Sequence, residues 1–193
     1  MNENKELEIT QTTSRPQGFI LAGGKSQRFG SDKSRARIGQ QTLIERIAQP
    51  LQEWTAQPIC VIADQQDKYA DLNLFTVADD FPGQGPLAGI HKALLTVQQN
   101  APESQQWAII ASCDLTRISP EWLEMLWQSS LNHQGSRMIC FEEKQDHSER
   151  QTLRWHPFPG CYHVSLIEEI ISMLEGSHRS CMKLIERLGS TAV

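Results

Sequence analysis

The residues best suited to chemistry lie in one glycine-rich, basic segment near the amino end of the chain. Residues 21–33 read LAGGKSQRFGSDK and follow a short apolar run that begins at Gly18. Gly23 and Gly24 let the backbone approach a ligand closely and adopt positive φ. Cations crowd this segment and the residues just after it, namely Lys25, Arg28, Lys33, Arg35 and Arg37. The pattern predicts a cradle for an anion such as a phosphate group.

Two well-known phosphate-binding loops do not fit this segment. A Walker A loop requires glycine five residues before Gly24, and that position holds Phe19. A Rossmann fingerprint requires G-x-G, whereas Gly23 is followed directly by Gly24. Glycine content and charge alone also allow a solvated basic turn, and that interpretation stays open at this point.

Carboxylates follow two later apolar runs. Asp80 comes after the run at 75–78, and Asp114 comes after the run at 107–112. In an open parallel sheet, ligands bind at the carboxyl ends of the strands, so these carboxylates and the Gly23 loop are expected at one edge. Phosphate beside carboxylate, without a cluster of histidine or cysteine, predicts a bridging Mg²⁺ held by few protein ligands. The alternative is that both are solvated loop carboxylates.

Short apolar runs and capping signals indicate the elements that position these loops. The runs lack polar alternation, which is typical of buried parallel strands, and lie at 18–22, 58–63, 75–78, 107–112 and 138–141. Helices are expected between them, at 42–54, 87–99, 119–130, 165–176 and 180–188. The order predicts an α/β three-layer sandwich, with a mostly parallel Rossmann-like sheet and helices on both faces.

Local signals set the expected ends of these helices. Thr42 and Glu45 form a capping-box pair, and Pro50 inside that helix predicts a kink or an early stop. Ser165 with Glu168 predicts a second capping box. The polar stretch 142–151 is expected to be an exposed loop.

Composition narrows the class of protein. The 193 residues carry a formal net charge of −5, which argues against a nucleic-acid partner. The length suits a single domain at 18–193 after a polar tail at 1–17. No apolar stretch predicts a membrane span, and the tail does not resemble a signal peptide. Five cysteines without a C-x-x-C pair favour a reducing cytoplasm.

The motif L-A-G-G-x-S-x-R-[FM]-G-x-D-K at 21–33 resembles the signature of the Rossmann-like nucleotidyltransferases, and most closely that of the molybdenum cofactor guanylyltransferases (MobA-type). Three later segments resemble the family in the same order. They are D-D-F-P-G-Q-G-P-L-A-G from Asp79, S-C-D ending at Asp114, and His156-Pro157 before an apolar segment and a helix. The resemblance covers about 18–188 and implies the nucleotide-diphospho-sugar transferase type of fold.

The family's reaction is transfer of GMP from GTP to molybdenum-molybdopterin, with release of pyrophosphate. The attacking phosphate is already ionised, so catalysis needs positioning and charge neutralisation more than a strong base. The resemblance assigns catalysis to Lys33, Arg28 and Asp114, and Mg²⁺ binding to Asp114. It assigns nucleotide binding to Leu21, Ala22, Gly23, Gly24, Lys33, Asp80, Gly85, Gly89 and Asp114. It also implies molybdopterin as substrate, and proteins of molybdenum insertion or molybdoenzyme maturation as partners.

Three departures from the family pattern keep two other functions open. Asp64 stands where the family has asparagine, residues 115–117 replace a proline and an aromatic, and an Asn-Thr-Pro-like closing motif is missing after 188. One alternative is a degenerate homologue that binds nucleotide or molybdopterin as a maturation partner. The other is a sister nucleotidyltransferase that uses CTP.

Overall fold

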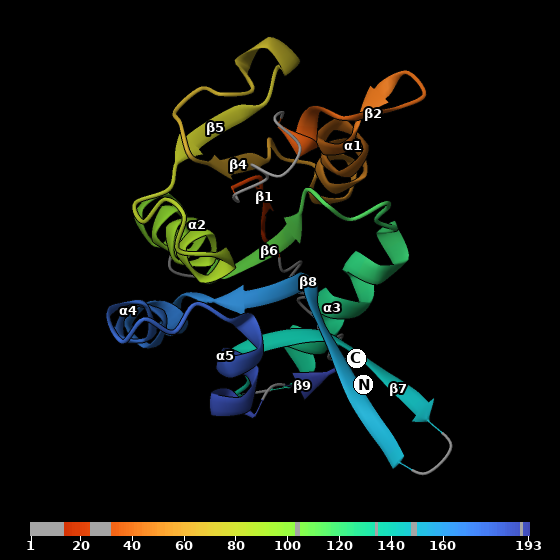
Figure 1. The fold of residues 1–193 in the computed structure, drawn as a ribbon, viewed down its shortest axis with the longest axis vertical. Helices are drawn as coiled ribbons and strands as arrows, with labels where there is room; N and C mark the ends of the chain where they lie inside the picture. The colour runs from red at the N-terminus through yellow and green to blue at the C-terminus, as the bar shows by residue number, and fades with distance from the viewer. Residues whose placement is uncertain (1–13, 24–31, 103–104, 134, 148–149, 190) are drawn as a thin grey trace, which may run out of the picture.

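The computed structural model describes residues 14–23, 32–102, 105–133, 135–147, 150–189 and 191–193. A seven-stranded sheet in the order β5-β4-β1-β6-β8-β7-β9 forms the centre of the molecule (Figure 1). Its strands are β1 (Gln17–Leu21), β4 (Cys60–Ala63), β5 (Phe75–Ala78), β6 (Trp107–Ser112), β7 (Met138–His147), β8 (Arg150–His163) and β9 (Thr191–Ala192). Strands β1, β4, β5 and β6 are parallel, and β8 is antiparallel to both β6 and β7. The mostly parallel α/β sheet predicted from the sequence is confirmed.

Helices cover both faces of this sheet because successive strand residues point to opposite sides. In β1, Phe19 and Leu21 join one buried cluster and Ile20 joins the other. Helices α2 (Pro86–Asn100), α4 (Ile167–Glu175) and α5 (Cys181–Leu188) pack on the first face. Helices α1 (Leu43–Thr55) and α3 (Pro120–Asn132) pack on the second. In Figure 1 the first group of helices lies to the left of the sheet and the second group to the right. The molecule therefore has three layers, with the sheet between two layers of helices.

Helix α1 covers nearly the residues that the sequence predicts, and its start forms as expected. The Thr42 N–H and hydroxyl donate to the Glu45 carboxylate at 2.8 and 2.6 Å, and the Glu45 N–H donates to Thr42 Oγ1. Of the kink or early stop predicted at Pro50, the early stop does not occur, because α1 continues to Thr55. Its buried side chains on both sides of the proline, Ile47 and Trp54 among them, keep the helix packed on the sheet despite the lost hydrogen bond.

The capping box expected at Ser165 and Glu168 is also wrong. Val164–Leu166 form a 3₁₀ turn before α4, and the Ser165 N–H donates to His163 Nδ1 at 3.2 Å. The histidine side chain, rather than a hydroxyl, therefore accepts the hydrogen bond at this turn.

Residues 142–151 do not form the expected loop, since most of them belong to the long β7–β8 hairpin. Prolines 157 and 159 obscured β8 in the sequence, because proline is rare inside strands. The pairing with β7 jumps from Gly160 to His156 between Cys140 and Phe141, so the prolines lie within a bulge. A short strand, β9, also follows α5, where the sequence indicated none.

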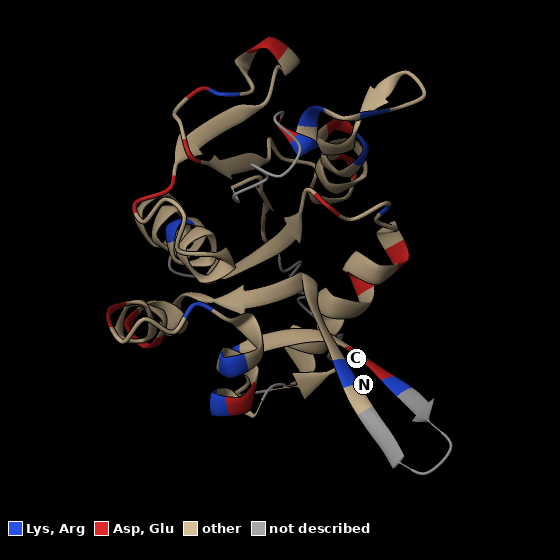
Figure 2. Ribbon diagram, viewed as in Figure 1, with Lys and Arg blue, Asp and Glu red and all other residues tan. Residues whose placement is uncertain are grey.

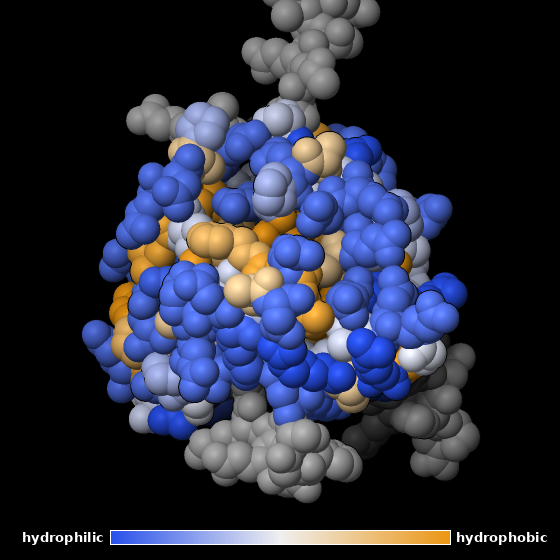
Figure 3. Space-filling view, turned by 90° about the horizontal axis from the view of Figure 1, so that it is seen from above, coloured by the Kyte–Doolittle hydropathy of each residue, from blue (hydrophilic) through white to orange (hydrophobic). Residues whose placement is uncertain are grey.

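The side of the molecule that carries β5 and the β2 (Arg37–Ile38) and β3 (Gln41–Thr42) ribbon is seen from above in Figure 3. Its surface is mostly hydrophilic, with hydrophobic residues gathered near the middle. Phe75 of β5 is 58% exposed and Ile38 of β2 is 48% exposed.

No helix in the described part of the chain is long and apolar enough to span a membrane.

Candidate active site

The carboxyl edge of the parallel strands brings Ala22 and Gly23 beside the loop of Asp114. Strand β1 lies between β4 and β6, and Leu21 pairs with both Ile62 and Ser112. The pairing continues past the strand ends, since the Ala22 N–H donates to the Ile62 carbonyl at 2.9 Å and the Cys113 N–H to the Leu21 carbonyl at 3.0 Å. The chain moves from β1 to β4 on one side and reaches β6 on the other. Ligands of open α/β sheets bind at such a switch point.

Gly23 is exposed directly after this junction. Among the described residues, none would lie within 4 Å of a Cβ atom built on Gly23, so packing against them does not require glycine here. Open space beside a strand end is what close approach of a ligand to the backbone needs. Leu21 and Ala22 are buried, which limits them to backbone contacts with a ligand at this edge. Gly24 and Arg28 lie outside the described residues.

Asp114 is exposed at the end of β6 and is held by its own loop. The Ser112 hydroxyl donates to Asp114 Oδ1 at 2.6 Å. Beside it, burial raises the pKa of the Cys113 thiol to about 11; the charges of Asp114 and Asp32 raise it further, and the charge of Lys33 lowers it. The charge of Lys33 therefore reaches the Cys113 thiol, the neighbour of Asp114 in sequence.

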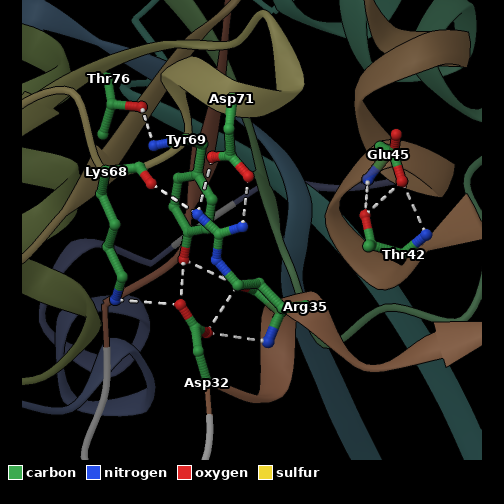
Figure 4. A network of polar contacts seen from close by, with 9 residues as sticks. Asp32, Arg35, Thr42, Glu45, Lys68, Tyr69, Asp71 and Thr76 are labelled. Atoms are coloured by element: carbon green, nitrogen blue, oxygen red, sulfur yellow. Dashed lines mark hydrogen bonds and ion pairs between the residues drawn. The ribbon is translucent and has the colours of Figure 1, made fainter.

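Lys33 begins the 3₁₀ turn η2 (Lys33–Arg35), and its exposure contrasts with the burial of its neighbour Ser34. Asp32 caps this turn, since its Oδ1 accepts from the Ser34 N–H at 3.0 Å and from the Ser34 hydroxyl at 2.6 Å. Its Oδ2 accepts from the Tyr69 hydroxyl at 2.9 Å and lies 3.1 Å from Lys68 Nζ (Figure 4). Among the described residues, none forms an ion pair with Lys33.

The carboxylate of Asp32 is therefore kept ionised inside the protein. Burial by itself would raise the pKa of Asp32, but hydrogen bonds from Ser34, Lys68 and Tyr69 outweigh it and hold this pKa below its ordinary value. Burial also raises the pKa of Tyr69 to about 12, so its hydroxyl keeps its proton and donates.

Lys68 and Tyr69 are the site residues that sequence reasoning missed. They belong to the connection between β4 and β5, and Tyr69 is fully buried. Lys68 Nζ also pairs with Asp64 at 2.8 Å, which neutralises the carboxylate that replaces the family's asparagine. The four-residue spacing of Asp64 and Lys68 was the one available signal. The contact with Asp32 joins residues too distant in sequence for any local pattern to show.

Asp79 and Asp80 lie at the same edge, after β5. Asp80 is exposed and pairs with Lys92 of α2 at 2.8 Å. Asp79 accepts from the Phe81 N–H at 2.9 Å, and burial raises its pKa above the ordinary value. Asp80 is therefore the more accessible carboxylate, but its charge is balanced by a lysine. The predicted contact of Asp80 with the guanine end stays a prediction.

The two glycines that the sequence analysis assigned to nucleotide binding lie at α2, where Gly85 is the N-cap and Gly89 is inside the helix, and both have identifiable structural roles. Gly85 precedes α2 with φ of +81°, a conformation that L side chains rarely adopt. Gly89 is buried in α2, where a Cβ atom would lie 2.9 Å from Leu21 Cδ2. Gly89 therefore lets α2 approach the end of β1 closely.

Replacing Gly89 with alanine is expected to lower the free energy of unfolding by about 1 kcal/mol. Overpacking typically costs about 1–3 kcal/mol, more than the roughly 1 kcal/mol that alanine gains over glycine in a helix. Urea unfolding would measure the difference. Gly176→Ala, at a position with negative φ and only ordinary contacts, is the control and should change little. Equal stability of wild type and Gly89→Ala would show that Leu21 moves aside freely.

Charged residues of both signs lie in the segments around these strands (Figure 2), although β1, β4, β5 and β6 themselves carry none. No group of three His, Cys, Asp or Glu side chains that could hold a metal ion occurs among the described residues. Mg²⁺ usually binds through one or two carboxylates together with substrate phosphates, and so does not need such a group. Exposed Asp114 beside the glycine loop fits that mode of binding.

Comparisons with known proteins identify the family of this chain. The family model described as MobA-like NTP transferase domain matches residues 18–191. A Bacillus cytotoxicus protein named "Probable molybdenum cofactor guanylyltransferase" is 31% identical over 173 residues, which are 87% of this chain and 78% of that protein. An Opitutus terrae protein of the same name is 31% identical over 119 residues, 62% of this chain and 57% of that protein, which is less than two thirds of its length.

Among solved structures, molybdopterin-guanine dinucleotide biosynthesis protein A from Archaeoglobus fulgidus has a TM-score of 0.65 and 19% identity. The match covers 92% of this chain and 82% of that chain, and it shows the shared fold. The family model covers nearly all of the chain from β1 to β9. The chain therefore belongs to the MobA-like NTP transferase domain family.

Proposed function

We propose that this protein transfers GMP from GTP to molybdenum-molybdopterin and releases pyrophosphate. The observation that carries the proposal is the meeting of the Gly23 loop and Asp114 at the β1–β6 switch point, in a chain of the MobA-like family. The names of the curated relatives support the choice of GTP and of a molybdopterin acceptor.

In the proposed reaction, a terminal phosphate oxygen of molybdopterin attacks the α-phosphorus of GTP. A bond forms between them, and the bond from the α-phosphorus to the bridging oxygen breaks, so that pyrophosphate leaves with that oxygen. The Gly23–Gly24 backbone, Lys33 and Arg28 bind the phosphates and neutralise their charge. Because the attacking oxygen is already ionised, no side chain has to remove a proton from it.

We propose that Asp114 holds Mg²⁺ at this site. The ion, when bound, would offset negative charge on the α-phosphate and on the leaving pyrophosphate. The hydrogen bond from Ser112 fixes one carboxylate oxygen of Asp114 and orients the other. Asp80 and the segment from Gly85 to Gly89 at the start of α2 would contact the guanine end, with Leu21, Ala22 and Gly23 contacting base and ribose through the backbone.

The cellular setting follows from this proposal. A chain that completes a molybdenum cofactor would exchange substrate and product with proteins of molybdenum insertion or molybdoenzyme maturation. The five cysteines are free thiols, which supports a reducing compartment such as the cytoplasm.

A thermal-shift panel of GTP, CTP, ATP and UTP, with and without Mg²⁺, tests the choice of nucleotide. GTP with Mg²⁺ should stabilise the fold most. At a ligand concentration about one hundred times its dissociation constant, the free energy of unfolding rises by about 2.7 kcal/mol. Each kcal/mol raises Tm by roughly 2–4 °C.

The other results of this panel separate the alternatives. Equal shifts with all four nucleotides would remove the guanine assignment, and a larger shift with CTP would favour a CTP-using enzyme. Binding of GTP and molybdenum-molybdopterin without formation of pyrophosphate would favour a binding partner without transferase activity.

A further inference from the structure

Asp32 connects the exposed Lys33 to a buried part of the protein. Its Oδ1 closes the turn that Lys33 begins, through the N–H and hydroxyl of Ser34. Its Oδ2 reaches Tyr69 and Lys68 in the connection between β4 and β5. Both anchors are buried, since Ser34 is 2% exposed and Tyr69 is fully buried. One carboxylate therefore ties the turn to the body of the sheet.

The third residue of the turn strengthens the same attachment. The Arg35 guanidinium donates to Asp71 at 2.8 and 2.9 Å and to the Lys68 carbonyl at 2.7 Å. It also lies over the Tyr69 ring, 5.1 Å from its centroid. Ser34 and Arg35 are thus both attached to the β4–β5 connection, as Figure 4 shows for Arg35, whereas Lys33 stays exposed.

The charge of Asp32 makes its orientation matter. A carboxylate next to Lys33 in sequence would compete with phosphate for the ammonium group if it faced solvent. Here its oxygens are occupied by Ser34, Tyr69 and Lys68, so its charge is balanced on the inner side of the turn. Lys33 then keeps its full charge for an external anion.

We propose that Asp32 is a positioning residue for Lys33, and that Tyr69 and Lys68 are the groups that hold it. The inference rests on the proposed function, which assigns Lys33 to the nucleotide phosphates. The inference adds a role for the β4–β5 connection, which contributes no residue to the family signature at 21–33. This connection determines how tightly the residues of that signature bind phosphate.

A double-mutant cycle on GTP binding with Mg²⁺ tests this, using Lys33→Ala, Asp32→Asn and the double variant. Asp32→Asn should weaken GTP binding about tenfold in the wild-type background and less than about twofold when Lys33 is already alanine. The effect of Asp32→Asn on GTP binding should disappear in the Lys33→Ala background, because Asp32 acts only through Lys33. Binding of guanosine, which has no phosphate, should be unchanged in Asp32→Asn.

Tyr69→Phe provides a second route, since it removes one hydroxyl and keeps the buried ring. It should weaken GTP binding about threefold to tenfold and, like Asp32→Asn, lose this effect in the Lys33→Ala background. Asp67→Asn is the matched control. It removes an exposed carboxylate from the same connection that accepts a hydrogen bond from the Gln66 side chain and, among the described residues, not from Asp32 or the turn at 33–35, and it should change GTP binding less than about twofold.

The outcomes separate this inference from the proposed function. If Lys33→Ala weakens GTP binding but Asp32→Asn and Tyr69→Phe have no effect, or have the same effect in both backgrounds, the positioning role is overturned and the function stands. Equal losses of GTP and guanosine binding would indicate general damage to the site and would also overturn it. If Lys33→Ala does not change GTP binding, the phosphate role of Lys33 fails and the inference fails with it.

Discussion

Replacing Asp114 with asparagine is expected to reduce guanylyl transfer at least about a hundredfold, which corresponds to about 2.7 kcal/mol of transition-state stabilisation. Asparagine keeps the shape of the side chain and one acceptor oxygen but removes the charge that would hold Mg²⁺. Pyrophosphate release from GTP and molybdenum-molybdopterin measures the effect. Binding of GTP without metal should survive, because Lys33 and the Gly23 backbone remain.

Asp67→Asn is the matched control for this experiment. Asp67 is exposed in the β4–β5 connection with φ of +55°, a conformation that asparagine also tolerates, and it should keep full activity. Full activity of Asp114→Asn would place the metal site elsewhere. Loss of metal-free GTP binding in the same variant would mean that Asp114 contacts the nucleotide itself.

Local signals explain why the sequence predicted most of the parallel half of the fold. Runs such as 107–112 are apolar throughout because strands covered on both faces need apolar side chains on both sides. The capping box joins Thr42 and Glu45, which are three residues apart, and both of its reciprocal hydrogen bonds form as expected. Such features depend on neighbours in sequence, so they can be recognised before the tertiary structure is known.

Strands whose formation depends on partners distant in the sequence were harder to predict from the sequence. Strand β8 contains Pro157 and Pro159 and is polar over much of its length, so its own composition does not favour a strand. Its partner β7 and a bulge between Cys140 and Phe141 provide the pairing. The same holds for β9, which has only two residues and depends entirely on β7.

The candidate site shows the same division. Gly23, Lys33, Asp80 and Asp114 could be found because each follows a strand or completes a motif. The lysines that balance the carboxylates near this edge could not be predicted. Lys92 pairs with Asp80, and Lys68 with Asp32, only after the chain has folded. The sequence therefore showed which groups reach the edge of the sheet, and the structure shows which of them remain unpaired.

Replacing Lys33 with alanine should weaken GTP binding about tenfold to a hundredfold and reduce guanylyl transfer at least as much. A hydrogen bond from an ammonium group to phosphate is charge-assisted and is among the stronger polar interactions in proteins. The expected change in stability of the free protein is within about 0.5 kcal/mol, because Lys33 is exposed. Calorimetric titration and urea unfolding measure the two quantities separately.

Lys144→Ala removes an exposed lysine from β7, in the antiparallel half of the sheet, and should alter neither quantity. A large loss of stability in Lys33→Ala, with GTP binding preserved, would make Lys33 a structural residue. The absence of an ion-pair partner for Lys33 among the described residues argues against that outcome. Its neighbours in the turn already carry the structural contacts, because Ser34 is buried against Tyr69 and Arg35 binds Asp71. Lys33 is the residue of the turn whose charge remains available to a ligand.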